Sequence, residues 1–181
     1  MAGSGYDEER KLISASLPEL DDYLDSEVLF WRIPRLNLML TPGNLLLAQL
    51  RSSQTQETDL VTARDSINQL IAKRQIAWEQ KIQKEVPARL NQWKASIDDF
   101  RENGSIDANY GYSVRVRVIL ALLLSRIQYP STNHVVLLEK MDSLLDLLSI
   151  RGSFIWNPEL APLFPESSFP FLFLHPKGGE K

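Results

Sequence analysis

Apolar residues recur along much of the chain at steps of three or four, which is the spacing of a buried stripe on an α-helix. The longest such pattern covers residues 58–103. Its apolar members are Leu60, Ala63, Ile67, Leu70, Ala77, Trp78, Ile82, Val86, Leu90, Trp93, Ile97 and Phe100. Pro87 interrupts it, and because a proline removes one backbone hydrogen bond and clashes with the preceding turn, we expect a kink or a break near residues 83–87.

Two further helices are predicted in the C-terminal half. Residues 114–128 contain the solid apolar run "VILALLL", and a helix that is apolar on nearly all sides belongs in the centre of a bundle. Residues 132–151 are amphipathic, with Thr132 as the expected cap and Gly152 as the expected stop. The core face of this second helix is expected to consist of Leu137, Leu138, Met141, Leu144, Leu145 and Leu148.

The N-terminal part gives shorter signals. Residues 1–11 are expected to be a loose polar start, followed by a short helix at "SLPELDDYL" with Ser16 and Glu19 as a capping box. Thr41-Pro42 predicts the start of another helix. Between them, residues 27–40 leave two alternatives open. Alternating leucines suit a small β element, whereas the proline that splits the run suits irregular chain.

The composition changes after residue 152. Residues 153–176 hold five of the ten prolines, and "FPFLFLHP" predicts an extended strap, apart from a short helical turn that starts at Asn157. The final "KGGEK" is expected to be disordered. Exposed apolar segments mark contact sites, so the strap either covers its own bundle or docks on another chain. The candidate partner-binding residues are Phe164, Phe169, Phe171 and Phe173.

Together these elements predict an all-α protein. The expected architecture is a single-domain bundle of four to six helices, with one long, Pro-kinked helix and an extended C-terminal strap. The bundle domain is expected to cover residues 1–152 and the strap residues 153–181. A chain of 181 residues suits one domain and can bury enough surface to fold without a disulfide or a structural metal.

Composition narrows the function classes. The chain has no cysteine, which excludes thiol catalysis, zinc-thiolate sites and a disulfide scaffold. A net charge of −3 gives no general electrostatic reason to expect nucleic acid or an anionic membrane as a partner. The longest apolar run falls well short of the roughly 20 residues that span a bilayer, and the first residues lack the apolar core of a signal peptide. We therefore expect a soluble, cytoplasmic protein without membrane insertion.

Two acidic stretches are the sharpest candidates for chemistry. "LDDYLD" places Asp21 and Asp25 four residues apart, and "IDDFRE" does the same with Asp98 and Glu102. Side chains at this spacing share one helical face, so each pair is a candidate Mg²⁺ site. Mg²⁺ is usually bound by one or two carboxylates together with substrate phosphates.

In this spacing the two stretches resemble the aspartate-rich motifs of trans-isoprenyl diphosphate synthases. The resemblance covers these two pentapeptides and implies an all-helical enzyme that holds magnesium and a diphosphate. The arginine pair that this family places soon after its first motif is replaced here by the separated Arg32 and Arg35. The alternative is that both stretches are solvated helix ends, because their carboxylates lie opposite the apolar side chains on a helical wheel.

Basic residues give two weaker signals. Lys73, Arg74, Lys81 and Lys84 follow one flank of the longest helical pattern, as in a stripe that tracks a phosphate backbone, or as the solvated edge of an amphipathic helix.

A second set of basic residues lies on the apolar helix, at Arg115, Arg117 and Arg126. These arginines either pair with acidic residues such as Glu139 or Asp142, or present a guanidinium fork to an anionic ligand. The two histidines, His134 and His175, lie in no metal-binding or catalytic motif and are expected to be structural or exposed.

The sequence favours a non-enzymatic helical interaction protein: an adaptor, a regulator or a small subunit of a larger assembly. It is expected to self-associate or to bind a protein partner, and to need no cofactor. The alternative function is a Mg-dependent all-α enzyme that acts on a phosphorylated or diphosphate substrate through the two acidic motifs. A nucleic-acid binder that uses the basic stripe ranks third.

Overall fold

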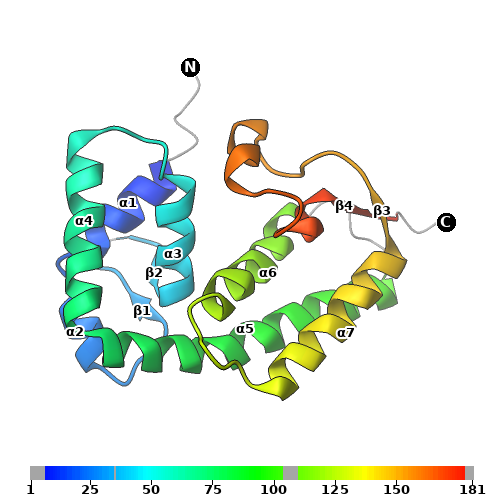
Figure 1. Ribbon diagram of the computed structural model, residues 1–181, viewed down its shortest axis with the longest axis horizontal. Helices are drawn as coiled ribbons and strands as arrows, with labels where there is room; N and C mark the ends of the chain where they lie inside the picture. The colour runs from blue at the N-terminus through cyan, green and yellow to red at the C-terminus, as the bar shows by residue number, and fades with distance from the viewer. Residues whose placement is uncertain (1–6, 35, 104–109, 178–181) are drawn as a thin grey trace. The chain divides into compact units, whose positions relative to one another are not determined.

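Helices account for most of the chain (Figure 1). The structure, a computed structural model, describes residues 7–34, 36–103 and 110–177. Its α-helices are α1 (Asp7–Ser16), α2 (Leu20–Asp25), α3 (Pro42–Arg51), α4 (Thr58–Lys73), α5 (Gln75–Asn103), α6 (Tyr110–Leu124) and α7 (Thr132–Leu148). The predicted all-α class is confirmed. These ranges hold one helix more than the upper end of the expectation, because residues 7–16 are helical rather than loose.

The extended elements are short. Strand β1 (Trp31–Arg32) pairs antiparallel with β2 (Met39–Leu40), so the small β element is the alternative that forms within residues 27–40. Strand β3 (Ser149–Arg151) pairs antiparallel with β4 (Leu174–Pro176). Two 3₁₀ helices, η1 (Pro158–Leu163) and η2 (Pro170–Phe173), shape the segment between β3 and β4.

The chain divides into two compact units, Met1–Glu85 and Val86–Lys181, and the boundary falls inside α5. The predicted division between residues 152 and 153 stays a prediction. No described helix combines the length and the apolar composition that crossing a bilayer requires.

In the first unit α1 packs against α3 and α4 (Figure 1). Leu12 and Ile13 of α1 are buried, and three acidic residues fill its first turn, where the helix dipole favours negative charge. The predicted loose start is therefore wrong for residues 7–11.

The predicted capping box is also wrong. Ser16 ends α1 instead of starting the next helix, and its hydroxyl donates to the carbonyl oxygen of Leu12 at 2.6 Å. The carboxylate of Glu19 accepts a hydrogen bond of 3.0 Å from the indole nitrogen of Trp31. Both side chains thus have partners other than the ones that a capping box requires.

The longest predicted helix does break, but not at its proline. Helix α5 runs continuously through Pro87, so a break near residues 83–87 is wrong. The helical run is interrupted instead at Arg74, whose backbone (φ −112°, ψ 29°) ends α4. Pro87 is exposed, and its buried neighbours Val86 and Leu90 hold the apolar stripe of α5 on either side of it.

The start of α3 is held by a buried carboxylate. Glu85 of α5 is fully buried and accepts hydrogen bonds from the Thr41 hydroxyl and the Gly43 backbone N–H, both at 2.7 Å. The Thr41 oxygen in turn accepts from the backbone N–H of Asn44 at 3.1 Å, as an N-cap does. A helix N-terminus carries unpaired N–H groups and partial positive charge, so the carboxylate meets both needs.

In the second unit α6 is the most buried helix, as predicted. Its buried residues are Tyr110, Val114, Val118, Ile119, Leu120 and Leu123. Helix α7 buries Leu138, Met141 and Leu145 from the predicted core face, and the segment η2 packs on α6. Helix α7 ends at Leu148, three residues before the predicted end, because residues 149–151 pair with β4.

We predict that Glu85→Gln lowers the free energy of unfolding by about 2 kcal/mol, because the two hydrogen bonds reach different carboxylate oxygens and an amide replaces one of these with an NH₂ donor. Urea unfolding of the full chain measures this change. Glu79→Gln is the matched control, since Glu79 is exposed on the same helix. Equal stability of the two variants would contradict this role of Glu85.

Candidate functional site

The first acidic motif lies on α2 and is bound by an arginine. The guanidinium of Arg74 forms ion pairs with both Asp21 and Asp25. The hydrogen bond to Asp25 raises the pKa of Arg74. The two carboxylates that the sequence singled out are therefore brought together, and they share a cationic side chain of their own unit.

The second acidic motif lies near the end of α5. The ammonium of Lys94 lies 2.5 Å from Asp98 and lowers the pKa of that carboxyl. Arg101 lies 3.5 Å from Asp98 and 3.3 Å from Glu102. Among the described residues, no three or more histidine, aspartate or glutamate side chains are grouped so that they could hold a metal ion. The Mg²⁺ site stays a prediction.

Three residues of the basic flank, Arg74, Lys81 and Lys84, have partners within the first unit. Lys84 forms an ion pair of 2.7 Å with Glu27. Lys81 is 3% exposed, and its ammonium donates to the carbonyl oxygens of Ser26 at 2.8 Å and Val28 at 2.5 Å. Burial lowers the pKa of Lys81. Little of the Lys81 charge is therefore presented at the surface.

The strap is clamped by an arginine of α6. Arg117 forms a bidentate ion pair with Asp142 of α7, with distances of 2.8 and 2.7 Å, so one of the pairings expected for these arginines is confirmed. The same guanidinium stacks over the Phe171 ring at 4.2 Å. The Tyr110 hydroxyl donates to the Phe171 carbonyl oxygen at 2.8 Å, and burial raises the Tyr110 pKa.

The predicted partner-binding phenylalanines belong to one aromatic cluster of the strap, which also includes Phe154 and Trp156. Phe164 and Phe171 are buried, and Phe169 and Phe173 are half-buried. The Phe169 ring contacts the rings of Phe164 and Phe171, with centroids 5.2 and 6.0 Å apart. The strap thus covers part of its own chain in this structure, and a role for these rings in binding a partner stays a prediction.

The outer face of α7 carries exposed aliphatic side chains that the sequence reasoning did not single out. Leu147 is 73% exposed and Val136 is 42% exposed. They border an open groove of about 490 Å³, whose lining residues are Val136, Glu139, Lys140, Ser143, Leu144 and Leu147. The signal was present in the sequence, because Val136 and Leu147 lie opposite the core face of the amphipathic pattern.

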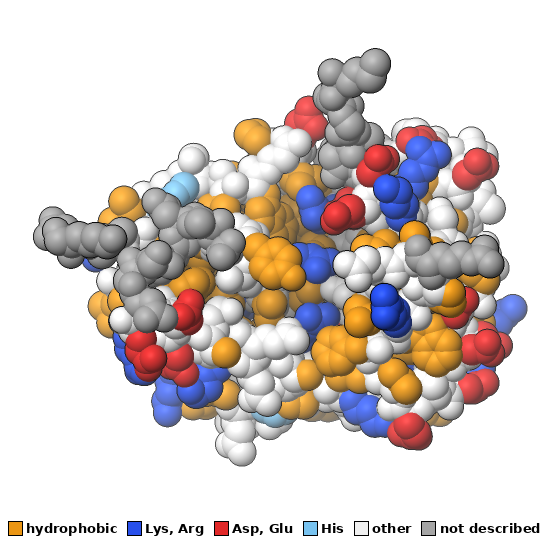
Figure 2. Space-filling view, turned by 180° about the vertical axis from the view of Figure 1, so that it is seen from behind, with side chains coloured by type: hydrophobic (Ala, Val, Ile, Leu, Met, Phe, Trp, Pro, Cys, Tyr) orange, Lys and Arg blue, Asp and Glu red, His pale blue; other side chains and the backbone are white. Residues whose placement is uncertain are grey.

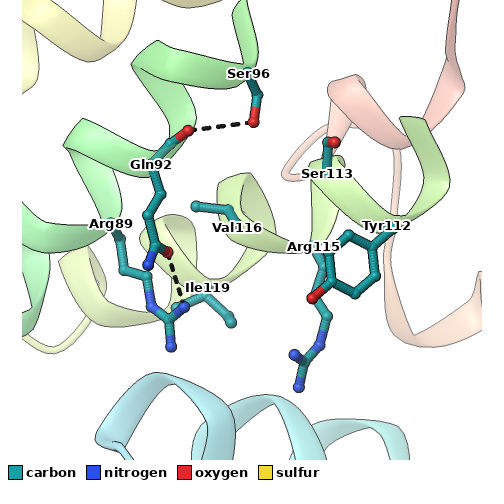
Figure 3. Close-up of a pocket in the computed structure, with 8 residues that line it drawn as sticks. All are labelled: Arg89, Gln92, Ser96, Tyr112, Ser113, Arg115, Val116 and Ile119. Carbon is teal, nitrogen blue, oxygen red and sulfur yellow. Dashed lines mark hydrogen bonds between the residues drawn. The ribbon is translucent and has the colours of Figure 1, made fainter. Parts of the chain in front are cut away.

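A pocket of about 280 Å³ lies between α5 and α6 (Figure 3). From α5 it is lined by Arg89, Gln92 and Ser96, and from α6 by Tyr112, Ser113, Arg115, Val116 and Ile119. Arg89 donates a hydrogen bond of 3.0 Å to the side-chain oxygen of Gln92. Of these residues only Arg115 was singled out as a candidate anion ligand. Arg89 gives no sequence signal, because its position in the pocket depends on how α5 and α6 pack.

Charges of both signs are interspersed near the edges of the face shown in Figure 2. This agrees with the nearly balanced composition of 20 basic and 23 acidic residues. The distribution of surface charge therefore does not by itself mark a binding site, and local geometry is the better guide.

We predict that Asp142→Asn destabilises the protein by about 2 kcal/mol, because it removes the charged partner of a largely buried guanidinium. Urea unfolding provides the measurement. Asp146→Asn, an exposed position one turn further along α7, is the control and should change stability by less than about 0.5 kcal/mol. Similar losses in both variants would argue against the clamp.

We also predict that MgCl₂ at millimolar concentration leaves the melting temperature equal to that in NaCl of the same ionic strength. The reason is that a metal would have to displace Arg74 or Lys94 from the motif carboxylates. A Mg²⁺-dependent rise that disappears when Asp21 and Asp25 are changed to Asn would contradict this expectation and favour the enzyme alternative.

The two surface features with the clearest local geometry are thus the outer face of α7 and the pocket between α5 and α6. Comparisons with models of known protein families, with curated proteins and with solved structures find no match to this chain.

Proposed function

We propose that the protein is a non-enzymatic helical interaction protein that self-associates through the outer face of α7. The observation that carries this proposal is the exposure of Leu147, at 73%, beside an apolar groove on the same helix. Covering a leucine side chain gains roughly 1.5–3 kcal/mol relative to leaving it in water. A second copy of this face supplies such cover.

The spacing of the residues on the outer face of α7 supports a symmetric contact between two copies. Val136, Lys140, Ser143 and Leu147 follow one another at steps of four, three and four, so they form one stripe along α7. The stripe extends over roughly 16 Å at 1.5 Å per residue. A two-fold axis near its middle would pair Val136 with Leu147 of a second copy, and the same contact would form twice.

The charges of the face are compatible with that arrangement. Glu139 and Lys140 both line the groove, so the face carries one charge of each sign. In the antiparallel register Lys140 lies opposite Ser143 of the second copy, one helical turn from its Glu139. Opposite charges therefore approach each other across the axis, which favours this orientation over a parallel one.

The contact is small compared with obligate interfaces. One helix face of this length falls below the roughly 1,200–2,000 Å² that stable complexes bury in total, so we expect a reversible, concentration-dependent dimer.

We predict that Leu147→Lys shifts this equilibrium to the monomer at every concentration, because two buried ammonium groups would replace the apolar contact. Sedimentation equilibrium over a hundredfold dilution measures the change. Ile76→Lys is the matched control, since Ile76 is 75% exposed on a different helix, and it should leave dimerisation as in the wild type. A wild-type chain that is monomeric throughout, or equal losses in both variants, would overturn the proposal.

A further inference from the structure

Helices α4 and α5 are joined by a single residue, Arg74, and run in clearly different directions on either side of it (Figure 1). The Arg74 N–H donates to the Leu70 carbonyl oxygen at 2.9 Å, and the Trp78 N–H donates to the Arg74 carbonyl oxygen at 3.0 Å. Both bonds have the spacing of an α-helix. Only the short joint between them therefore departs from one continuous helix.

The local sequence does not require a bend at this joint. Residues 71–77, with the sequence "IAKRQIA", contain neither glycine nor proline, and most of them are good helix formers. Arg74 is also unsuited to cap the start of α5, because a guanidinium has donors but no acceptor for the free N–H groups. Helix propensity in this stretch therefore favours a single helix that continues across the joint.

Contacts with α2 oppose that continuation. The guanidinium of Arg74 forms ion pairs with Asp21 and Asp25, which follow each other at one helical turn. Two bonds to one planar guanidinium restrict the direction of the side chain, and through it the backbone of the joint. The two carboxylate side chains are 59% and 68% exposed, and ion pairs at such exposure are weak and screened by salt. This restraint is therefore easily released.

An isolated chain has a strong reason to stay bent. Lys81 and Glu85 are buried on α5, and both bind groups of residues 26–43. Straightening the joint within one chain would carry these charges away from their partners, which is severely destabilising. A second copy offers the same donors and acceptors, so the contacts can form again between two chains.

A very short connection between two packed elements is also the kind that invites exchange between copies. We propose that the joint at Arg74 is the hinge of a domain exchange. When the ion pairs with Asp21 and Asp25 are released, α4 and α5 become one helix, and the segment α1–α4 packs on α5 of a second copy. The acidic stretch "LDDYLD" is thus assigned a structural role, as a latch that keeps the wild-type joint closed.

The experiment is refolding of the full chain from urea over a hundredfold range of protein concentration, followed by sedimentation analysis. Every chain carries Leu147→Lys, which removes the contact proposed for α7. Adding Arg74→Ala should give a dimer whose fraction rises with the concentration during refolding. Arg74→Gly is the matched control, because it loses the same ion pairs but disfavours a helix across the joint. It should give on the order of fivefold less dimer.

The continuity of the helix is measured with a pair of spin labels. Because the chain has no cysteine, labels can be placed at Asp65→Cys on α4 and Gln83→Cys on α5, two exposed positions. They are five whole helical turns apart, so a continuous helix holds them about 27 Å apart on one face. We expect this separation in the Arg74→Ala dimer, diluted with unlabelled chain, and a shorter one in the monomer.

The latch is tested with Arg74 left in place. Asp21→Asn together with Asp25→Asn should raise the dimer fraction at least threefold, because the guanidinium then has no charged partner on α2. Asp22→Asn is the matched control, since Asp22 is exposed on the same helix and takes no part in these ion pairs. It should leave the dimer fraction unchanged.

Three results would each overturn the proposal: a chain that stays monomeric in every variant, a dimer that keeps the label separation of the monomer, or equal dimerisation of the Arg74→Ala and Arg74→Gly chains. The α7 contact does not enter these measurements, because Leu147→Lys is present throughout. Failure of the exchange can therefore be told from failure of the proposed self-association.

Discussion

The burial of the Glu85 carboxylate at the start of α3 is the constraint on which the first unit depends. An unpaired charge in that position would be severely destabilising, so the start of α3 must present its donors at the point where the phase of α5 places the carboxylate. One turn earlier on α5, Lys81 meets the opposite requirement with carbonyl oxygens that follow α2. Glu85 thus binds a backbone N–H at the start of α3, and Lys81 binds backbone carbonyl oxygens after α2. Through these contacts α5 fixes the positions of both segments.

In the second unit a largely buried charged group is likewise satisfied, here by side chains. Arg117 is satisfied by Asp142 of α7 and lies against Phe171, while Tyr110 binds the backbone beside that ring. The Trp156 indole nitrogen adds a hydrogen bond of 2.8 Å to the Gly111 carbonyl oxygen. The strap is consequently attached through both backbone and aromatic contacts. This attachment removes much of the apolar surface of the strap from water, whereas Leu147 on the outer side of α7 and Ile150 of β3 stay exposed.

The sequence predicts long amphipathic elements well and contacts between distant residues poorly. The three buried residues of α7 all belong to the face that periodicity predicts, although Leu137, Leu144 and Leu148 of that face are only half-buried. The position of the helix break does not follow from the sequence pattern. The break occurs at Arg74, whose side chain binds two aspartates some 50 residues earlier, whereas Pro87 is tolerated at an exposed position. The pocket between α5 and α6 could not be predicted either, since its lining residues on the two helices become neighbours only through tertiary packing. Val136 and Leu147 of the outer face of α7, by contrast, lie at positions outside the predicted core face, whereas Leu144 was expected in the core and lines the outer groove.

The clamp on Phe171 also has a consequence for the order of events during synthesis. Residues 110–148 leave the ribosome before the strap does, so Arg117 and Asp142 can pair while the place of Phe171 is still empty. The contact between Tyr110 and Phe171 spans 61 residues, and contacts of such long range form slowly. A nascent chain therefore passes through a stage in which α6 and α7 are formed but the apolar surface that the strap later covers is still exposed. During that interval the uncovered apolar surface is available for aggregation or for chaperone binding.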